Sequence, residues 1–307
     1  VGRRPMAARI PGWRQVAGGA CGSWSGRNGN GPGTMPPDDG GGPCLGTPPD
    51  ALSLACRDAA GSRPPSQGAR MSEFFHMGGY AWYVWIICML LDDVTYYWFH
   101  RQNHMVRFFW AAHIVHHSSD NFNLGTAVRN GWFTILYKPF FYVWIVMIGF
   151  PPEMLIVCLG VEALWQFQLH TRYVPKMGII ERFLNTHTMH QVHHARNLEY
   201  MDKNHGGILN IFDKIFGTWK ELDPEIDIEY GVSTPPNSYN LWIILTHEYK
   251  NIWEDTKKSK SWRHKFMYVF GPPGWSHDGS TMTVKEMQKD LEKAREMKKS
   301  AKLTKLA

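Results

Sequence analysis

Long apolar stretches alternate with polar segments over the middle of the chain. Three stretches stand out, at residues 74–91, 131–150 and 153–169, and the third is the most polar because two glutamates interrupt it. About 20 mainly apolar residues in a row are enough for a helix to cross a membrane. The pattern therefore predicts an all-α integral-membrane protein built from helical hairpins. The third stretch fits either a re-entrant arm or a helix packed inside the bundle.

A turn between the second and third stretches determines which parts of the chain share a side of the membrane. Pro151 and Pro152 follow the second stretch directly, and proline is not tolerated in the interior of a helix. The chain is therefore expected to enter the membrane and to return. His117, before this hairpin, and His170, after it, then lie on the same side.

The chain after residue 170 is mostly polar. The segments 208–219 and 241–253 are short and amphipathic, which suits a position at a membrane interface. Fourteen lysines and arginines lie between residues 250 and 307, and basic residues favour the cytosolic side of a membrane. We therefore expect the histidine-rich side to be cytosolic, at the endoplasmic reticulum of a eukaryote or the inner membrane of a bacterium.

Residues 1–70 differ in composition from the rest of the chain. They hold 15 of the 29 glycines and 10 of the 19 prolines, and they contain no lysine or glutamate. Such a segment buries too little apolar surface to offset its conformational entropy, so we expect it to be disordered. Two explanations stay open: an organelle transit peptide or, as we favour, sequence upstream of a start at Met71. The chain then divides into this leader, a membrane-embedded domain at 71–220 and a cytosolic C-terminal extension at 221–307.

The charge distribution argues against a nucleic-acid partner. The net charge is +6 and aromatic residues make up 14% of the chain. A nucleic-acid interface interleaves basic residues with exposed aromatics. Here the aromatics lie mostly in the apolar stretches, whereas the basic residues gather in the leader and the C-terminal tail.

Eight of the fifteen histidines form three motifs at helical spacing. The motifs are one HxxxH and two HxxHH, and residues three or four apart share one face of a helix. They comprise His100, His104, His113, His116, His117, His190, His193 and His194.

The number and spacing of these histidines favour metal binding over a merely polar helix face. A single HxxHH arises easily by chance, but three motifs on one side of a membrane hairpin need a common cause. Neutral imidazole is the most frequent metal ligand in proteins. A zinc site uses three or four protein ligands, so eight histidines are too many for one ion. The motifs therefore predict two metal ions held close together.

The motifs and their flanking residues resemble the fatty acid hydroxylase superfamily of membrane di-iron enzymes, which includes sterol desaturases. The resemblance covers about residues 93–219. It rests on YYWFHR, WAAHIVHHSSDNFNLGTAVR, ERFLNT, HQVHHARN, DKNHGG and FDKIFGTW, which follow the family's order. HHSSDNFNL and the late GPPGWSHDGS are most similar to the alkylglycerol monooxygenase branch and its bacterial sterol desaturase-like relatives.

The resemblance implies that the eight motif histidines bind two iron ions. It adds His170 as a further ligand or a neighbour of the ligands, and His205 as a weaker candidate. His187 stands where the family usually has proline, so we do not count it as a ligand. Asp92 and Asp93 precede the first motif by about two turns, and they either hydrogen-bond ligand imidazoles or cap the membrane helix.

The function that the resemblance implies is an O2-dependent di-iron oxidoreductase that hydroxylates or desaturates a lipid C–H bond. The substrate would be an ether lipid, a sterol or a fatty acyl chain. The chain has no nucleotide-binding motif, so the reductant is external, either a tetrahydropterin or the electron-donor protein cytochrome b5. The alternative is a non-catalytic membrane protein whose histidines bind structural zinc.

Overall fold

The computed structural model describes residues 80–306, which belong to one compact unit. Within this range the regular elements are α-helices and one short 3-10 helix, with two isolated antiparallel bridges and no strand. The all-α prediction is thus confirmed for the described residues, and the expected leader lies outside them. The elements are α3 (Trp82–Met105), α4 (Arg107–His117), α5 (Leu124–Ala127), α6 (Thr134–Met147), α7 (Pro152–Gln168), η1 (Gly178–Arg182), α8 (His187–His193), α9 (Ile211–Ile215), α10 (Leu241–Lys257), α11 (Trp262–Phe270) and α12 (Val284–Leu306).

Residues 82–91 of the first apolar stretch continue into the first histidine motif as one helix. We expected the apolar helix to end at Asp92 and Asp93, but α3 runs for 24 residues and contains both. Their side chains are buried, because this part of α3 packs against α7 and α6 instead of facing solvent. The two aspartates therefore do not cap a helix, and that expectation was wrong.

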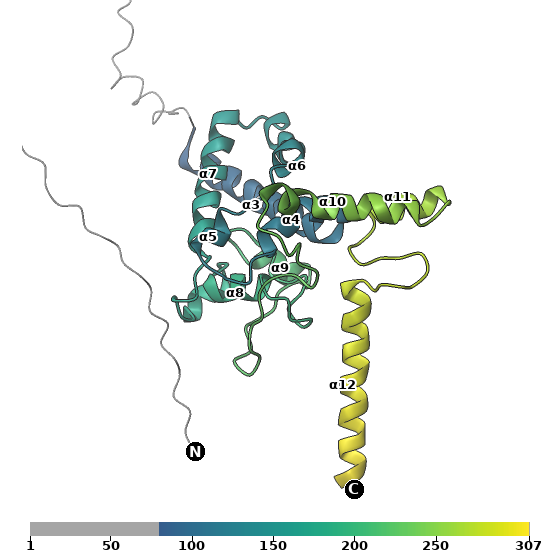
Figure 1. Ribbon diagram of the computed structural model, residues 1–307. Helices are drawn as coiled ribbons and strands as arrows, with labels where there is room; N and C mark the ends of the chain where they lie inside the picture. Colours follow the sequence, from purple (N-terminus) through teal and green to yellow (C-terminus); the bar gives the residue numbers. More distant parts are fainter. Residues whose placement is uncertain (1–79, 307) are drawn as a thin grey trace, which may run out of the picture. The chain divides into compact units, whose positions relative to one another are not determined.

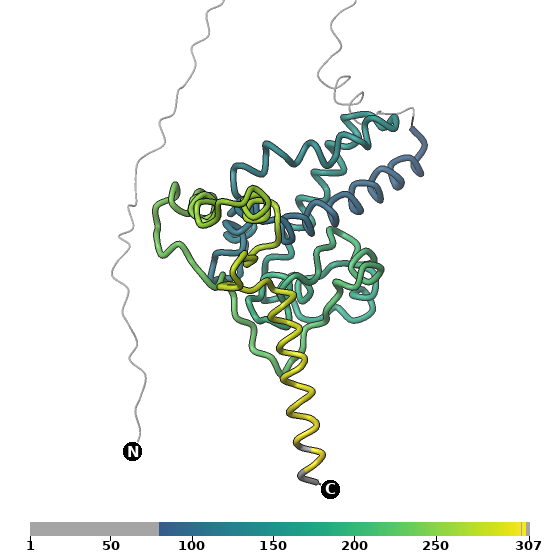
Figure 2. The backbone as a smooth tube through the Cα atoms, turned by 90° about the vertical axis from the view of Figure 1, so that its right-hand side faces the viewer, coloured from purple at the N-terminus to yellow at the C-terminus, as the bar shows by residue number. Residues whose placement is uncertain are grey.

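The second and third stretches form the expected hairpin of α6 and α7, which lie beside the N-terminal half of α3 (Figures 1 and 2). The chain turns at Gly149, whose positive φ of 109° suits glycine. It then enters α7 with Pro151 as the N-cap and Pro152 in the first turn. The three helices enclose an apolar core of Cys88, Phe99, Tyr142, Ile145, Met154, Leu155 and Cys158.

No helix among residues 80–306 is both long enough and apolar enough to cross a membrane. α6 has 14 residues, which gives a length of about 21 Å against the roughly 30 Å of a hydrocarbon core. α3 is longer, but polar side chains occupy its second half. Part of the first apolar stretch, residues 74–79, lies outside the described residues, and membrane insertion stays a prediction.

The C-terminal helices α10 and α11 pack against α4. α10 packs against α4 and α11, and the amphipathic stretch expected at 241–253 lies within it. Arg107, at the start of α4, donates to Glu248 at 2.8 Å and pairs with Asp255 at 2.6 Å. All three side chains are at most 18% exposed, so these ion pairs are weakly screened by solvent.

Replacing Glu248 by alanine is expected to lower the free energy of unfolding by about 1.5–3 kcal/mol, because a buried hydrogen bond to a charged group is lost while Asp255 still neutralises Arg107. Glu254→Ala is the matched control: among the described residues Glu254 pairs only with Lys250, at 3.7 Å, and both side chains are more than half exposed. We expect this control to change stability by less than about 0.5 kcal/mol. Denaturant titration of both variants measures the difference, and equal losses would contradict the structural role of Glu248.

Two further segments of the C-terminal half are helical in part or throughout. The segment 208–219 contains only the five-residue α9, and its remaining residues form the turns beside it. The charged tail is helical over 23 residues as α12. α12 contacts the loop after α8: Gln288 donates to the Leu198 and Met201 carbonyls, and Arg295 pairs with Glu199 at 2.5 Å.

Candidate metal centre

The structure brings nine of the ten candidate histidines together in two adjacent groups. Within each group, one ring nitrogen of every residue lies within 4.8 Å of the others. The five-histidine group contains His100, His104, His113, His117 and His193, and the four-histidine group contains His116, His170, His190 and His194.

Each HxxHH motif supplies both groups. In α4, His113 and His117 are one helical turn apart and face the five-histidine group, whereas His116 points to the other. In α8 the division is reversed: His193 joins the five-histidine group, while His190 and the C-cap residue His194 join the four-histidine group. The two groups therefore adjoin, and the His117 and His194 rings stack with their centroids 4.4 Å apart.

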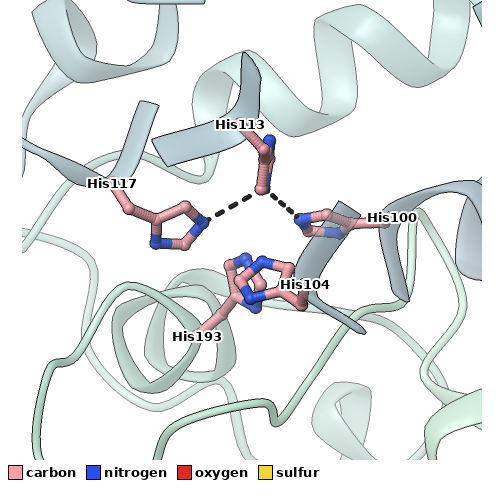
Figure 3. A group of neighbouring side chains, drawn as sticks. All are labelled: His100, His104, His113, His117 and His193. Carbon is pink, nitrogen blue, oxygen red and sulfur yellow. Dashed lines mark hydrogen bonds between the residues drawn. The ribbon is translucent and has the colours of Figure 1, made fainter. Parts of the chain in front are cut away.

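The ring nitrogens of the five-histidine group converge on one point. Figure 3 shows His113 between His117 and His100, with His104 and His193 close by. The Nε2 atom of His113 is 3.1 Å from Nε2 of both His100 and His117. The Nε2 atoms of His104 and His193 are buried and have no hydrogen-bond partner in the described part of the chain.

The four-histidine group has the same construction. The Nε2 atom of His170 lies 3.2 Å from Nε2 of His116 and 3.0 Å from Nε2 of His190, and Nε2 of His194 lies 3.2 Å from that of His190. A neutral imidazole has one N–H donor and one acceptor nitrogen, so the Nε2 atoms that face each other here cannot all be paired in hydrogen bonds. A bound cation would take up the lone pairs that converge in each group, so the residues fit two metal ions.

Backbone carbonyls on the outside of the groups orient the rings. When Nδ1–H donates outward, the Nε2 lone pair points to the centre, as in most protein metal sites. Four rings make such a bond, with Nδ1···O distances of 2.8–3.2 Å: His100 to His205, His116 to Thr126, His170 to Gln166 and His193 to Lys203.

Burial keeps these imidazoles in the neutral form that binds metal. It lowers the pKa of all nine histidines, and for most of them neighbouring imidazoles lower it further. The pKa falls to about 4 for His170 and for His193, in both cases chiefly because of desolvation. At neutral pH their lone pairs are therefore available to a metal ion.

His205 lies beside the five-histidine group without belonging to it. Its ring is 1% exposed, and the ring centroid is 4.9 Å from that of His104. Its carbonyl accepts the His100 bond, while its backbone N–H donates to Asp213 at 2.8 Å. His205 thus supports a candidate ligand through its backbone, and an exposed position is ruled out.

Two carboxylates hold the DKNHGG loop and the residues after it; sequence reasoning missed Asp213 and gave Asp93 a different role. Asp213 accepts from the N–H groups of His205 and Gly206, and Asp93 accepts from the N–H of Ile208 at 2.6 Å and of Leu209. Asp93 therefore positions a loop and does not bond a ligand imidazole, as one alternative had it. Asp93 lies in α3 and Asp213 in α9, and both accept from backbone N–H groups, which no residue pattern in the sequence marks.

The family model for fatty acid hydroxylase matches residues 85–218. The chain contains a fatty acid hydroxylase domain. The domain includes both histidine groups and the loop that supports them.

The proteins to which this chain is similar carry the names of lipid-modifying enzymes. The chain is 37% identical over 193 residues to human alkylglycerol monooxygenase and 34% identical over 207 residues to that of Caenorhabditis elegans; each alignment covers 63% of this chain. It is 22% identical over 150 residues to a Delta(7)-sterol 5(6)-desaturase of Gibberella zeae, 46% of this chain and 43% of that protein. The chain spans 43% of the human protein and 40% of the nematode protein. No solved structure matches significantly.

His187→Pro is expected to leave metal content and turnover unchanged. His187 is the first residue of α8 and belongs to neither group. Proline is tolerated at the first position of a helix, where no intrahelical hydrogen bond is lost. Metal analysis and turnover of the purified variant measure the effect, and the loss of either would show that His187 serves the hydroxylase domain directly.

Proposed function

We propose that this protein is an O2-dependent di-iron oxidoreductase that hydroxylates a lipid C–H bond. The observation that carries the proposal is the pair of adjoining, buried histidine groups, with converging nitrogens, inside a fatty acid hydroxylase domain. Iron suits imidazole ligands. The relatives named alkylglycerol monooxygenase support a monooxygenase reaction.

The protein's own residues would hold the ions, exclude water and keep the ligands neutral. Two iron ions bound by the five- and four-histidine groups would supply the redox chemistry that reduces O2 and oxidises the lipid. Aromatic side chains shield the centre: Phe122 stacks on His170 with centroids 5.5 Å apart, and Trp110 lies 5.2 Å from His104. The overall reaction converts R–H, O2, two electrons and two protons into R–OH and water.

The substrate that we propose is an ether lipid, because the relatives with the higher identities are alkylglycerol monooxygenases. Hydroxylation of the carbon beside an ether oxygen gives a hemiacetal, which collapses to an aldehyde and a glycerol. Desaturation of a sterol or fatty acyl chain is the weaker alternative, given the lower identity to the desaturase. The electrons would come from a tetrahydropterin or from cytochrome b5.

We also propose that the protein sits in a membrane with the histidine groups at the cytosolic face. Support comes from apolar side chains on α6 and α7 that are at least two-thirds exposed: Ile135, Leu136, Phe140, Met147, Ile156 and Leu164. An apolar surface of this kind marks a membrane or protein contact, and the substrate is itself a lipid.

A second candidate is a zinc-binding protein without enzymatic activity. The four-histidine group favours it, because a closed zinc site takes four nitrogen or sulfur ligands. Under this alternative one or both groups would hold zinc, and no O2 would be consumed.

Metal analysis separates the two candidates. The full chain is expressed with iron-57, purified in detergent, and examined by elemental analysis and Mössbauer spectroscopy. We expect two coupled irons per chain, and O2 consumption that depends on an added ether lipid and reductant. Zinc alone, with no iron uptake on anaerobic reconstitution, would overturn the di-iron proposal and favour the zinc-binding alternative.

A further inference from the structure

A cavity of about 980 Å³ adjoins α8, the helix that carries His190 and His193. Three segments supply its wall: residues 172–182, which include η1, residues 188–191 of α8, and residues 214–224, which begin in α9. None of the nine histidines of the metal centre belongs to this wall. The cavity is therefore a second candidate site, and the function proposed so far does not use it.

Hydrogen bonds between the three segments fix the shape of the cavity. The side chain of Asn210, the residue before α9, donates to the Glu181 carbonyl at 2.7 Å and to the sulfur of Met189 at 3.3 Å. The ammonium group of Lys214 donates to the carbonyl of Arg182. These contacts join α9 to η1 and to α8, so the wall is a packed structure and not a gap between loose loops.

The wall carries more positive than negative charge. Four basic residues line the cavity: Arg172, Lys176, Arg182 and Lys214. Lys176 pairs with Glu221, whereas the other three have no ion-pair partner among residues 80–306. Unpaired cations gathered around one cavity attract an anion.

The second acidic residue of the wall, Glu181, does not neutralise these cations. Its side chain is buried. Its Oε1 atom accepts from the hydroxyl groups of Thr186 and Thr188, at 3.0 and 2.7 Å, and from the N–H of Met177 at 3.1 Å. Glu181 thus binds donors of its own surroundings, and the three cations remain available to a ligand.

Arg172 links the cavity to the metal centre. Its guanidinium group lies over the Tyr230 ring, 5.9 Å from the centroid. Tyr230 stacks on Phe122 with centroids 5.1 Å apart and ring planes 8° apart, and Phe122 stacks in turn on His170 of the four-histidine group. A ligand held by Arg172 would therefore be separated from that group by two stacked rings.

Exposed apolar side chains lie beside the same cations. Ile179 of η1, Phe183 directly after η1, and Ile215 at the end of α9 are each more than 60% exposed. Phe183 follows Arg182 in the chain, and Ile215 follows Lys214. Apolar side chains next to basic ones are typical of segments that lie at a membrane interface, as the amphipathic pattern of residues 208–219 predicts for α9.

We propose that this cavity binds the phosphate group of an anionic membrane phospholipid. Arg172, Arg182 and Lys214 would neutralise the phosphate, which guanidinium groups bind in bidentate geometry. The three exposed apolar side chains would enter the acyl layer beside the headgroup. The inference rests on the proposed function, because an enzyme that acts on a lipid must contact the bilayer. The bound headgroup holds the bilayer next to α8 and its histidines.

Equilibrium dialysis of the full chain in a neutral detergent, with radiolabelled dioctanoyl phosphatidic acid as the probe, tests the site. We expect saturable binding, which the double variant Arg182→Gln with Lys214→Gln weakens by about 25-fold, since each basic residue beside an anionic lipid contributes about fivefold. Lys298→Gln with Lys299→Gln is the matched control, because it removes the same charge from exposed positions of α12 outside the cavity. The control should bind the probe like wild type.

Phe183→Ser distinguishes a lipid from a soluble phosphate. It should weaken binding of the dioctanoyl lipid by about fivefold, because part of a large apolar side chain no longer contacts the acyl chains. Binding of inorganic phosphate should not change. Tyr239→Ser, at a fully exposed aromatic residue outside the cavity, is the control and should affect neither ligand.

The proposal is overturned if the cavity variant and the α12 control bind the lipid within about twofold of each other. It is also overturned if wild type binds inorganic phosphate as tightly as the lipid, which would indicate a site for soluble anions. Thermal unfolding reports the fold of each variant, and Arg182→Gln alone, with an expected fivefold loss, serves if the double variant does not fold. Wild type that binds no iron would overturn the proposed function, whereas two bound irons without lipid binding would overturn this inference alone.

Discussion

Replacing His116 by alanine is expected to remove one metal ion and all measurable turnover. His116 is one of four residues whose nitrogens converge in the four-histidine group, and its loss leaves three. Its Nδ1 bonds the Thr126 carbonyl and its Nε2 faces His170, so no neighbour replaces it without moving a helix. His193→Ala should have the same effect through the five-histidine group. Elemental analysis and product formation measure both.

Loss of function in these variants must be separated from loss of the fold. His264→Ala is the control, because His264 belongs to neither group and contacts His277 and Trp275 instead. It should retain both metal ions and full turnover. Membrane fractionation and thermal unfolding should be similar for all three variants. Full activity in His116→Ala or His193→Ala would refute the ligand assignment.

The metal-free protein is expected to lose much of its stability as the pH falls through the range from 6.5 to 4. The ordinary pKa of histidine is 6.5, and burial lowers that of His170 to about 4 in the folded chain. Above pH 6.5 both states are neutral and the contribution is fully present. Between these values the unfolded state binds more protons, so stability is lost as pH falls.

The size of this effect for His170 alone is about 3.5 kcal/mol, since the pKa falls from 6.5 to about 4 and each unit corresponds to about 1.4 kcal/mol. The other buried histidines shift in the same direction, so the total is larger. Denaturant titration of the metal-free chain across this pH range measures it. His170→Gln should reduce the pH dependence by roughly the stated amount, and an unchanged dependence would show that His170 titrates normally. Bound metal should delay the loss to lower pH, because protons compete with metal for the same nitrogens.

The local pattern of residues was enough to predict the helices and the candidate ligands. The apolar stretches and the proline pair marked α6, α7 and the turn between them. The HxxxH and HxxHH spacing placed eight histidines on helix faces, and the resemblance added His170. These features are local: a helical period of 3.6 residues aligns residues three and four apart whatever the rest of the chain does.

How those residues combine depends on the packing of the helices against one another. It divided each HxxHH motif between two groups, because α4 and α8 face each other with His117 stacked on His194. It buried Asp92 inside α3 against Glu162 of α7, although we had expected a helix to end at Asp92. It also placed the carboxylates of Asp93 and Asp213 where they accept hydrogen bonds from the backbone in and directly after the DKNHGG loop. Spacing along the chain fixes the face on which a side chain lies, but its partner depends on long-range packing between helices far apart in sequence, which local spacing does not encode.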